Sequence, residues 1–591
     1  MIQRRLDSPR PDLYIFIFSA WAFSVAYFHS RLWSLLDLAR SPFSWGAAMF
    51  FIVFTAVAWL YGFYNLGVVI FARIYRIQQR QKEPMIAALP ASPPAVAILY
   101  TTCNDFVETS ANSCVAQDYP EFTVYILDDS SDPAYKLRID RYAARYPKRV
   151  RVVRRGHRTG YKAGNINHGL THAATREPLF ALVDADEILG RDFLRRIIPR
   201  LLADHRCGFV QANHQCNAKR ASPLGAALGT GIGIHWRWYH PLRNRYGFVM
   251  LLGHGAVVRR SCWKQIGGFP HVVSEDLAFA LRIREHGWRG HFAEDVVCYE
   301  DFPPTIRAFR VRHMKWTRGT CELLCKEMWR MIRSRNISLV EKLDVLFPTL
   351  NLPLSLFYFL FVLDANFVLP TLFGRPHPLT VSLGSTHFIL RGWQLHPAFG
   401  VLNGRDFFLI TLLTLLSPIL CFLIELAPRP GDLFRFLSRS TAVYGALAPL
   451  SAAGVIFYFA TGKAEFHVTA DQTNLARPKT SAPGLGRADR FRMGLNRLFS
   501  GSHPDHPVVQ GFEILCGVVL GLTCLGLLQI SFLGVAMAYV LLPVLHHVSW
   551  EHPLIQRLIY IPLLFILGGL GLTTMALLGL QPVLFSFGFH F

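Results

Sequence analysis

The chain has 591 residues, 52% of them hydrophobic, and a net charge of +22 from 61 Lys and Arg against 39 Asp and Glu. Its mean hydropathy of +0.28 is too high for an ordinary soluble protein, and its length allows several folding units. The basic residues lie beside apolar runs and no nucleic-acid reader motif is present, which argues against a nucleic acid partner and favours a membrane surface or an anionic substrate.

Two apolar runs, 12–30 and 45–72, are long enough to span a bilayer and follow a basic start with Arg4, Arg5 and Arg10. Because basic residues collect on the cytosolic side of membranes, we expect residues 1–82 to form a transmembrane hairpin that begins and ends in the cytosol. No small-residue cleavage site follows the first run, so no cleaved signal peptide is predicted.

Residues 83–302 have the composition of a soluble domain. Apolar runs of strand length at 95–100, 124–127, 150–153 and 179–183 alternate with helical stretches. This alternation predicts an α/β fold with a mostly parallel sheet, in which ligands bind at the carboxyl ends of the strands.

Acidic residues follow these predicted strands. Asp184 and Asp186, separated by Ala185, suit a Mg²⁺ or Mn²⁺ ion that neutralises a sugar diphosphate, although a solvated loop also contains this pattern by chance. Asp129 is a candidate ligand of a base or ribose, with an Asp- and Ser-rich turn as the alternative. Asp105 is a candidate contact of a uracil ring.

Two further motifs lie at predicted helix starts. The stretch 158–167 contains Lys162 and Asn165 and suits a loop that faces a nucleotide, or an ordinary helix N-terminus. Ser274 is the expected N-cap of the second helix. Glu275 and Asp276 follow it, and either they complement the helix dipole or Asp276 is the base that deprotonates an acceptor hydroxyl.

Residues 303–340 predict basic amphipathic helices at a membrane surface. Arg312, Lys315 and Arg318 can hold a diphosphate, and the indole of Trp316 can stack on a sugar. The alternative is a helix that faces lipid and makes no substrate contact.

The second half contains predicted spans at 344–366, 405–427, 510–528, 530–547 and 556–579, which makes seven in all. Residues 462–508 are rich in Lys and Arg and should be cytosolic. The apolar run 441–460 then has both ends on one side, so we expect an interfacial or re-entrant helix, with a plain eighth span as the alternative. The expected divisions are transmembrane and interfacial helices at 341–461, a cytosolic loop at 462–508 and transmembrane helices at 509–591.

Taken in order, these motifs resemble the processive family 2 glycosyltransferases, the group of cellulose synthase and hyaluronan synthase. The shared order is Asp105, Asp129, the stretch 162–165, Asp184-x-Asp186, Glu275-Asp276 and a helix with a basic-x-x-basic-Trp pattern. The resemblance implies a cytosolic GT-A-type domain at 83–302. It also implies that Asp105 and Asp129 hold the uridine, that Asp184 and Asp186 hold phosphate and metal, and that Asp276 is the base.

The resemblance extends to two loops and also has departures. Gly253 and His254 occupy the place of the family's acceptor-terminus loop, and Phe466, Val468 and Thr469 match its Phe-x-Val-Thr gating loop. The family's Gln-x-x-Arg-Trp is Arg312-x-x-Lys315-Trp316 here, so Arg318 is expected to supply the missing guanidinium. The chain also leaves no room after its last span for a cyclic-dinucleotide domain, which favours a β-glucan other than cellulose.

These features together predict a multi-pass enzyme of the cytoplasmic (inner) membrane. It would polymerise a nucleotide sugar, with UDP-glucose as the expected donor, into a β-glucan with a non-cellulosic linkage such as β-1,3 or mixed linkage, and pass the growing polysaccharide across the lipid bilayer. Its expected cofactor is Mg²⁺ or Mn²⁺, and accessory export subunits fit this role. The alternatives are a transferase that adds one sugar to a polyprenyl phosphate and a non-catalytic export or scaffold subunit.

Overall fold

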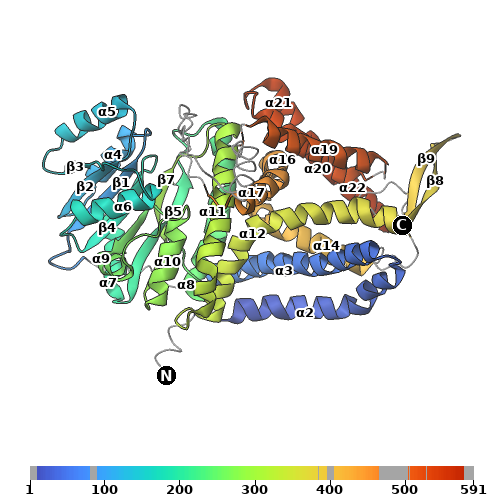
Figure 1. Cartoon of the computed structure of the whole chain (residues 1–591), viewed down its shortest axis with the longest axis horizontal. Helices are drawn as coiled ribbons and strands as arrows, with labels where there is room; N and C mark the ends of the chain where they lie inside the picture. The colour runs from blue at the N-terminus through green and yellow to red at the C-terminus, as the bar shows by residue number, and fades with distance from the viewer. Residues whose placement is uncertain are drawn as a thin grey trace, which may run out of the picture.

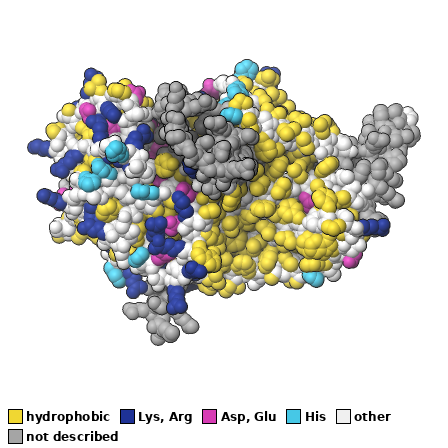
Figure 2. Space-filling view, in the orientation of Figure 1, with side chains coloured by type: hydrophobic (Ala, Val, Ile, Leu, Met, Phe, Trp, Pro, Cys, Tyr) yellow, Lys and Arg dark blue, Asp and Glu magenta, His cyan; other side chains and the backbone are white. Residues whose placement is uncertain are grey.

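The computed structural model describes residues 9–79, 89–383, 385–395, 405–464, 504, 506–526 and 529–577. They form an α/β domain that stands against a body of long apolar helices, with helix α11 (Ile306–Arg333) between the two (Figure 1). Lys and Arg side chains gather over the α/β domain, whereas the visible flank of the helical body is largely hydrophobic (Figure 2). A charged domain beside an apolar body is the arrangement of a membrane-inserted enzyme with one water-exposed domain.

The α/β domain contains a seven-stranded sheet in the order β3-β2-β1-β4-β6-β5-β7. Only β6 runs against the others within this sheet. The strands are β1 (Val96–Thr102), β2 (Phe122–Asp128), β3 (Val150–Val153), β4 (Leu179–Asp184), β5 (Cys207–Cys216), β6 (Ala256–Arg259) and β7 (Arg289–Glu300). The mostly parallel sheet and the four strands predicted first, β1 to β4, are confirmed.

Helices cover both faces of this sheet, which is why its central strands are apolar throughout. In β1, Val96, Ile98 and Tyr100 enter one hydrophobic core and Ala97 and Leu99 enter the other. The helices are α4 (Glu108–Val115), α5 (Pro133–Ala144), α6 (Tyr161–His172), α7 (Phe193–Ala203), α8 (Pro223–Tyr246), α9 (Arg260–Ile266) and α10 (Glu275–Glu285).

The helical body is assembled from both ends of the chain. Its elements are α2 (Asp12–Trp33), η1 (Ser34–Leu38), α3 (Pro42–Gln79), α12 (Leu339–Leu363), η2 (Asp364–Val368), α13 (Leu369–Phe373), α14 (Arg405–Leu416), η4 (Ser417–Ile419), α15 (Leu420–Leu426), α16 (Pro430–Val443), α17 (Ala448–Thr461), α19 (Pro507–Gly526), α20 (Ile530–Leu545), α21 (Pro553–Leu558) and α22 (Ile561–Leu577). Large apolar side chains such as Phe23, Phe43 and Leu522 are exposed on it, as expected of surface that faces lipid.

Seven helical segments among the described residues are long and apolar enough to cross a membrane. They are Asp12–Leu38, Pro42–Gln78, Leu339–Phe373, Arg405–Leu426, Pro430–Thr461, Pro507–Gly526 and Pro553–Leu572. The predicted number of seven spans therefore matches, but the segments that make up the seven differ in two places. The predicted span 530–547 corresponds to α20, whose 16 residues make it shorter than the ~30 Å apolar layer.

The second difference concerns the run 441–460, which we expected to be one interfacial or re-entrant helix. It contains the end of α16, a break at residues 444–447 and most of α17, and the whole segment Pro430–Thr461 qualifies by length and composition as a span. Helix α17 is mostly buried and packs against α11 and α12. Whether this segment crosses the bilayer stays a prediction.

A two-stranded antiparallel hairpin lies at the end of the helical body remote from the α/β domain (Figure 1). Its strands are β8 (Gly374–Leu383) and β9 (Thr386–Leu395). The hairpin lies between the predicted spans 344–366 and 405–427, where no strand was expected from the sequence. The helical body separates it from the α/β domain.

Candidate active site

The predicted acidic residues meet at the carboxyl edge of the sheet, as expected for a parallel arrangement. They border a cavity of about 2360 Å³ between the sheet edge, α10, α11 and the helical body. Its lining includes Asp105, Asp129, Lys162, Asn165, Asp184, Asp186, Gly253, His254, Glu275, Asp276, Arg312, Lys315 and Trp316. Of the other predicted site residues, Arg318 does not line the cavity, and Phe466, Val468 and Thr469 lie outside the described residues.

Lys162 and Asp184 form the central ion pair of the cavity. Lys162 Nζ lies 2.5 Å from Asp184 Oδ1 and donates to the carbonyl oxygen of Gly253 at 3.0 Å, while the Thr101 hydroxyl donates to the same Asp184 oxygen at 2.9 Å. Burial alone would raise the pKa of Asp184, but Lys162 outweighs it and lowers this pKa to about 2. Asp184 is therefore a carboxylate at neutral pH.

Asp186 has the opposite environment. Burial and the neighbouring carboxylates of Asp184 and Glu300 raise the pKa of Asp186 to about 7, because each disfavours a further negative charge. A divalent cation shared by Asp184 and Asp186 would remove this repulsion. Two carboxylates at a strand end are the hard oxygen ligands that Mg²⁺ and Mn²⁺ accept, so this pair fits the expected ion.

The side of the cavity lined by Asp105 and Asp129 contains a residue that the sequence did not reveal. Arg155 forms a bidentate pair with Asp129, with its Nε 2.8 Å from Oδ1 and its Nη2 2.6 Å from Oδ2. Asp105 accepts hydrogen bonds from the Cys103 amide and the Thr102 hydroxyl. Asp129 thus faces the cavity with its charge already paired, because the chain turns Arg155 back from beyond β3.

The loop before α6 is tightly folded. Gly160 and Tyr161 have positive φ of 72° and 50°, and a Cβ on Gly164 would lie 1.9 Å from the carbonyl oxygen of Thr159. Asn165 is buried and donates to the Leu127 carbonyl oxygen at 2.9 Å, so it joins α6 to the end of β2. The motif therefore combines two cavity cations, Arg158 and Lys162, with residues that shape the turn.

Glu275 and Asp276 begin α10 beside the Gly253 loop. Gly253 has a φ of 84°, and a Cβ there would lie 3.1 Å from Asp276 Oδ2, so a glycine permits this close approach. Burial raises the pKa of Asp276, and burial with the Asp276 charge raises the pKa of Glu275. Ser274 is the N-cap by position, but its side chain makes no capping hydrogen bond.

Helix α11 contributes basic and aromatic groups. Arg312 lies with its guanidinium 4.7 Å from the ring centre of Trp316, and its Nε and Nη2 have no hydrogen-bond partner among the described residues. Arg318, in contrast, is buried and donates to the Lys463 carbonyl oxygen at 2.6 Å. The expectation that Arg318 supplies a guanidinium to the cavity is wrong. Arg318 lies on a different face of α11 from Arg312 and binds Lys463, which follows the end of α17.

Residues of the helical body close the cavity on the side of Trp316. Trp236 of α8 lines it together with four aromatic residues from the second half of the chain: Phe422, Phe436, Tyr444 and Trp550. Such aromatic surfaces, with polar edges nearby, suit the apolar faces and hydroxyls of sugars. No local sequence pattern indicates this wall, because its members become neighbours only on folding.

Residues 95–319 match the family model described as "Glycosyltransferase like family 2". The probable glucomannan 4-β-mannosyltransferase 11 of Arabidopsis thaliana is 27% identical over 255 residues, 42% of this chain and 57% of that protein. The glucomannan 4-β-mannosyltransferase 1 of Oryza sativa subsp. japonica is 28% identical over 231 residues, 38% of this chain and 44% of that protein. The chain thus spans about half the length of these curated relatives.

Among solved structures, the mannosyltransferase PcManGT from Pyrobaculum calidifontis, in complex with GDP-Man and Mn²⁺, is 19% identical with a TM-score of 0.41. That match covers 64% of this chain and 99% of the other.

Proposed function

We propose that residues 95–319, which match the family 2 glycosyltransferase model, are the catalytic domain of a processive, inverting polysaccharide synthase that is embedded in a membrane. The observation that carries this proposal is the single cavity that joins the carboxylates of the sheet edge to the aromatic wall of the helical body. Its volume exceeds the roughly 300–1,000 Å³ of ordinary small-molecule sites. It therefore has room for both a nucleotide sugar and several units of a polymer.

The proposed reaction is one in-line displacement at the anomeric carbon. Asp276 takes the proton of the acceptor hydroxyl, the acceptor oxygen forms its bond to the anomeric carbon, and the bond from that carbon to the diphosphate breaks. The raised pKa of Asp276 suits a base that must accept a proton near neutral pH. Lys162 and Arg312 are positioned to balance the charge of the departing diphosphate.

Asp184 and Asp186 are the proposed holders of a Mg²⁺ or Mn²⁺ ion, which when bound supplies Lewis-acid stabilisation of the diphosphate. Lys162 keeps Asp184 ionised for this purpose. Asp105 and the Asp129–Arg155 pair are the proposed contacts of the base and ribose.

The donor is proposed to be a nucleotide-activated hexose. The resemblance favours UDP-glucose and a β-glucan, whereas the names of the relatives favour a mannose donor and a β-1,4 linkage. A mannan-type product therefore stands beside the glucan. The single-addition, lipid-linked transferase is less favoured because it needs no long aromatic wall.

The test is to incubate the purified full chain with UDP-glucose, GDP-mannose and other nucleotide sugars, with Mg²⁺ or Mn²⁺, and to size the product. We expect a polymer, which linkage-specific hydrolases then identify. A product with one sugar on an extracted lipid would refute processivity, and no donor consumption with any nucleotide sugar would refute the enzyme assignment.

We further propose that the enzyme is a multi-pass protein of the cytoplasmic membrane with its α/β domain in the cytosol. Seven candidate spans and the concentration of Lys and Arg over the α/β domain support this orientation (Figure 2).

A further inference from the structure

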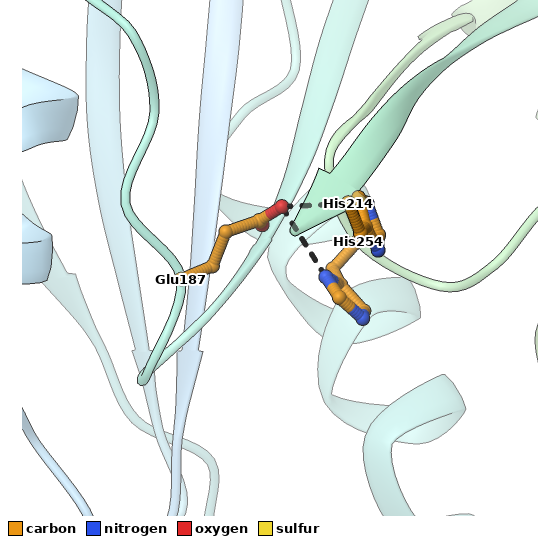
Figure 3. A group of neighbouring side chains, drawn as sticks. All are labelled: Glu187, His214 and His254. Carbon is orange, nitrogen blue, oxygen red and sulfur yellow. Dashed lines mark ion pairs between the residues drawn. The ribbon is translucent and has the colours of Figure 1, made fainter. Parts of the chain in front are cut away.

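Beneath the catalytic aspartates lies a cluster of three side chains to which the proposed reaction gives no role. Glu187 follows Asp186 at the end of β4, His214 lies on β5, and His254 lies in the loop before β6 (Figure 3). These strands are neighbours in the order β4-β6-β5, so the sheet itself brings the three side chains together. Glu187 and His214 are fully buried, and His254 is 15% exposed at the cavity.

One oxygen of Glu187 lies between the two imidazoles. Glu187 Oε1 is 3.2 Å from His254 Nδ1 and 3.6 Å from His214 Nε2, and the three ligand atoms lie within 4.8 Å of one another. Ligands about 2.1 Å from a tetrahedral ion are separated by roughly 3.4 Å. The two distances from Glu187 Oε1 therefore match the distances between ligand atoms in a tetrahedral metal site.

These contacts are not hydrogen bonds. Glu187 Oε1 and His254 Nδ1 are buried and have no hydrogen-bond partner among the described residues. The other oxygen of Glu187, Oε2, accepts from the Gly255 amide at 3.0 Å, which holds the carboxylate in place. A buried carboxylate oxygen aimed at two ring nitrogens needs a cation beside it, which is either a protonated imidazole or a metal ion.

Gln211 lies beside the ligand nitrogen of His214. Gln211 accepts from the Leu252 amide through Oε1, so its Nε2 is the donor end, and this nitrogen lies 3.2 Å from His214 Nε2. The same Nε2 lies 2.9 Å from the His254 carbonyl oxygen, which is an alternative acceptor for its N–H. Metal binding by His214 Nε2 therefore requires Gln211 to donate to that carbonyl oxygen instead.

Gly255 keeps the space beside the cluster clear. It has a φ of 58°, and a Cβ there would lie 2.4 Å from His214 Nε2 and 2.5 Å from Glu187 Oε1. Any side chain at this position would displace the three groups.

We propose that Glu187, His214 and His254 bind a divalent ion of the Zn²⁺ class, separate from the ion expected at Asp184 and Asp186. Two imidazole nitrogens and one carboxylate form the mixed donor set that zinc accepts, whereas Mg²⁺ prefers oxygen ligands alone. The ion joins β4, β5 and the Gly253 loop. That loop accepts the Lys162 hydrogen bond and approaches Asp276, so the ion positions catalytic groups rather than touching the substrate.

The test measures how much zinc the full chain retains. The protein is purified in detergent, loaded with zinc and desalted, and its metal content is then determined by mass spectrometry. We expect stoichiometric zinc in the wild type and its loss in His214→Gln and Glu187→Gln. Asp186→Asn, at the other proposed site, and His205→Gln, an exposed histidine, should both retain it. The measurement needs no donor and is independent of the proposed transfer reaction.

If the variants do not fold, X-ray absorption at the zinc edge of the wild-type protein still tests the proposal. We expect a first shell of nitrogen and oxygen with the scattering pattern of imidazole. A wild type without retained zinc would show that Glu187 and a protonated His254 form an ion pair only, which overturns the proposal. A sulfur-containing shell, retention in His214→Gln or loss in Asp186→Asn would overturn it as well.

Discussion

Asp276 is one of three carboxylates whose charges act on the ammonium group of Lys162. Asp184 forms the direct contact, while Glu275 and Asp276 are near enough for their charges to act on the Lys162 pKa. Burial alone would lower this pKa, but the carboxylates outweigh it and raise it. The pKa of Asp276 is raised by burial, whereas the charges of Lys162 and His254 lower it, so Asp276 gains its basicity from its buried position.

We expect Asp276→Asn to lower kcat by about 10²–10⁴-fold, because the variant removes the proposed proton acceptor but keeps the shape of the side chain. The dissociation constant of the nucleotide should stay nearly unchanged. The measurements are polymer synthesis and nucleotide titration on the same preparation.

Asp140→Asn is the matched control, since Asp140 is half-exposed and pairs with Arg154 away from the cavity. It should retain full synthesis. Loss of nucleotide binding in Asp276→Asn would remove Asp276 from the role of base.

At the residue scale, the sequence predicted acids that directly follow apolar strands, because strand ends are local signals. It did not predict Arg155 on Asp129 or the association of Glu187 with His214. These pairs depend on how β3 and β5 are placed in the sheet, which no local pattern encodes.

Among the elements, β1, β2 and β4 were predictable because each contains an apolar run buried on both faces, whereas β3 is a four-residue edge strand with an exposed Arg151. Strands β5 and β7 contain polar residues such as Gln211, His214 and Glu294, so periodicity does not reveal them. Helix α11 was predicted as a surface helix, but it is held between the sheet domain and the helical body.

A buried ion pair joins helix α11 to helix α19. Arg310 Nη2 lies 2.5 Å from Glu513 Oε2, and both side chains are almost fully buried. Glu513→Gln leaves the guanidinium without its counter-charge, so we expect a loss of about 3–5 kcal/mol in the free energy of unfolding. Chemical denaturation in detergent measures this loss.

The exposed pair of Arg145 with Glu108 provides the control for this variant. Glu108→Gln should cost no more than about 1 kcal/mol, because exposed pairs are screened by water. Equal effects of the two variants would contradict a structural role for the Arg310–Glu513 pair.

The contact of α11 with α17 should depend on pH. His313 Nε2 lies 2.6 Å from the Ser451 hydroxyl, and burial, together with Arg312 and Arg310, lowers the pKa of His313 to about 4. A lowered pKa means that stability is present above the unfolded value of about 6.5 and is lost as pH falls toward 4. Between pH 7 and 5 we expect a loss of about 2 kcal/mol from this group.

Thermal unfolding at several pH values checks this expectation. His313→Gln should remove that part of the pH dependence, and His205→Gln, at an exposed position, should leave it unchanged. The same slope in His313→Gln and the wild type would assign the pH dependence to other groups.

For the whole molecule, the α/β domain and the β8–β9 hairpin lie at opposite ends of the helical body (Figure 1). If that body fills the bilayer, Ser385→Cys in the hairpin turn should react with a membrane-impermeant maleimide in intact cells. Asp140→Cys, on the α/β domain, should react only after the cells are opened.

The unmodified chain is the control, because it contains 11 cysteines of its own. Labelling of Asp140→Cys in intact cells would reverse the proposed orientation. The sequence predicted the orientation from its basic residues but indicated neither the short length of α20 nor the hairpin, since composition does not show where a helix ends or how a connecting segment folds.

The cavity wall has a consequence for any attempt to isolate the catalytic half. Residues 89–333 contain every proposed catalytic group, yet Phe422, Phe436, Tyr444 and Trp550 come from later in the chain. An excised fragment would open one side of the acceptor path to solvent. Water would then compete for the anomeric carbon, so such a fragment should hydrolyse donor to free sugar instead of extending a chain.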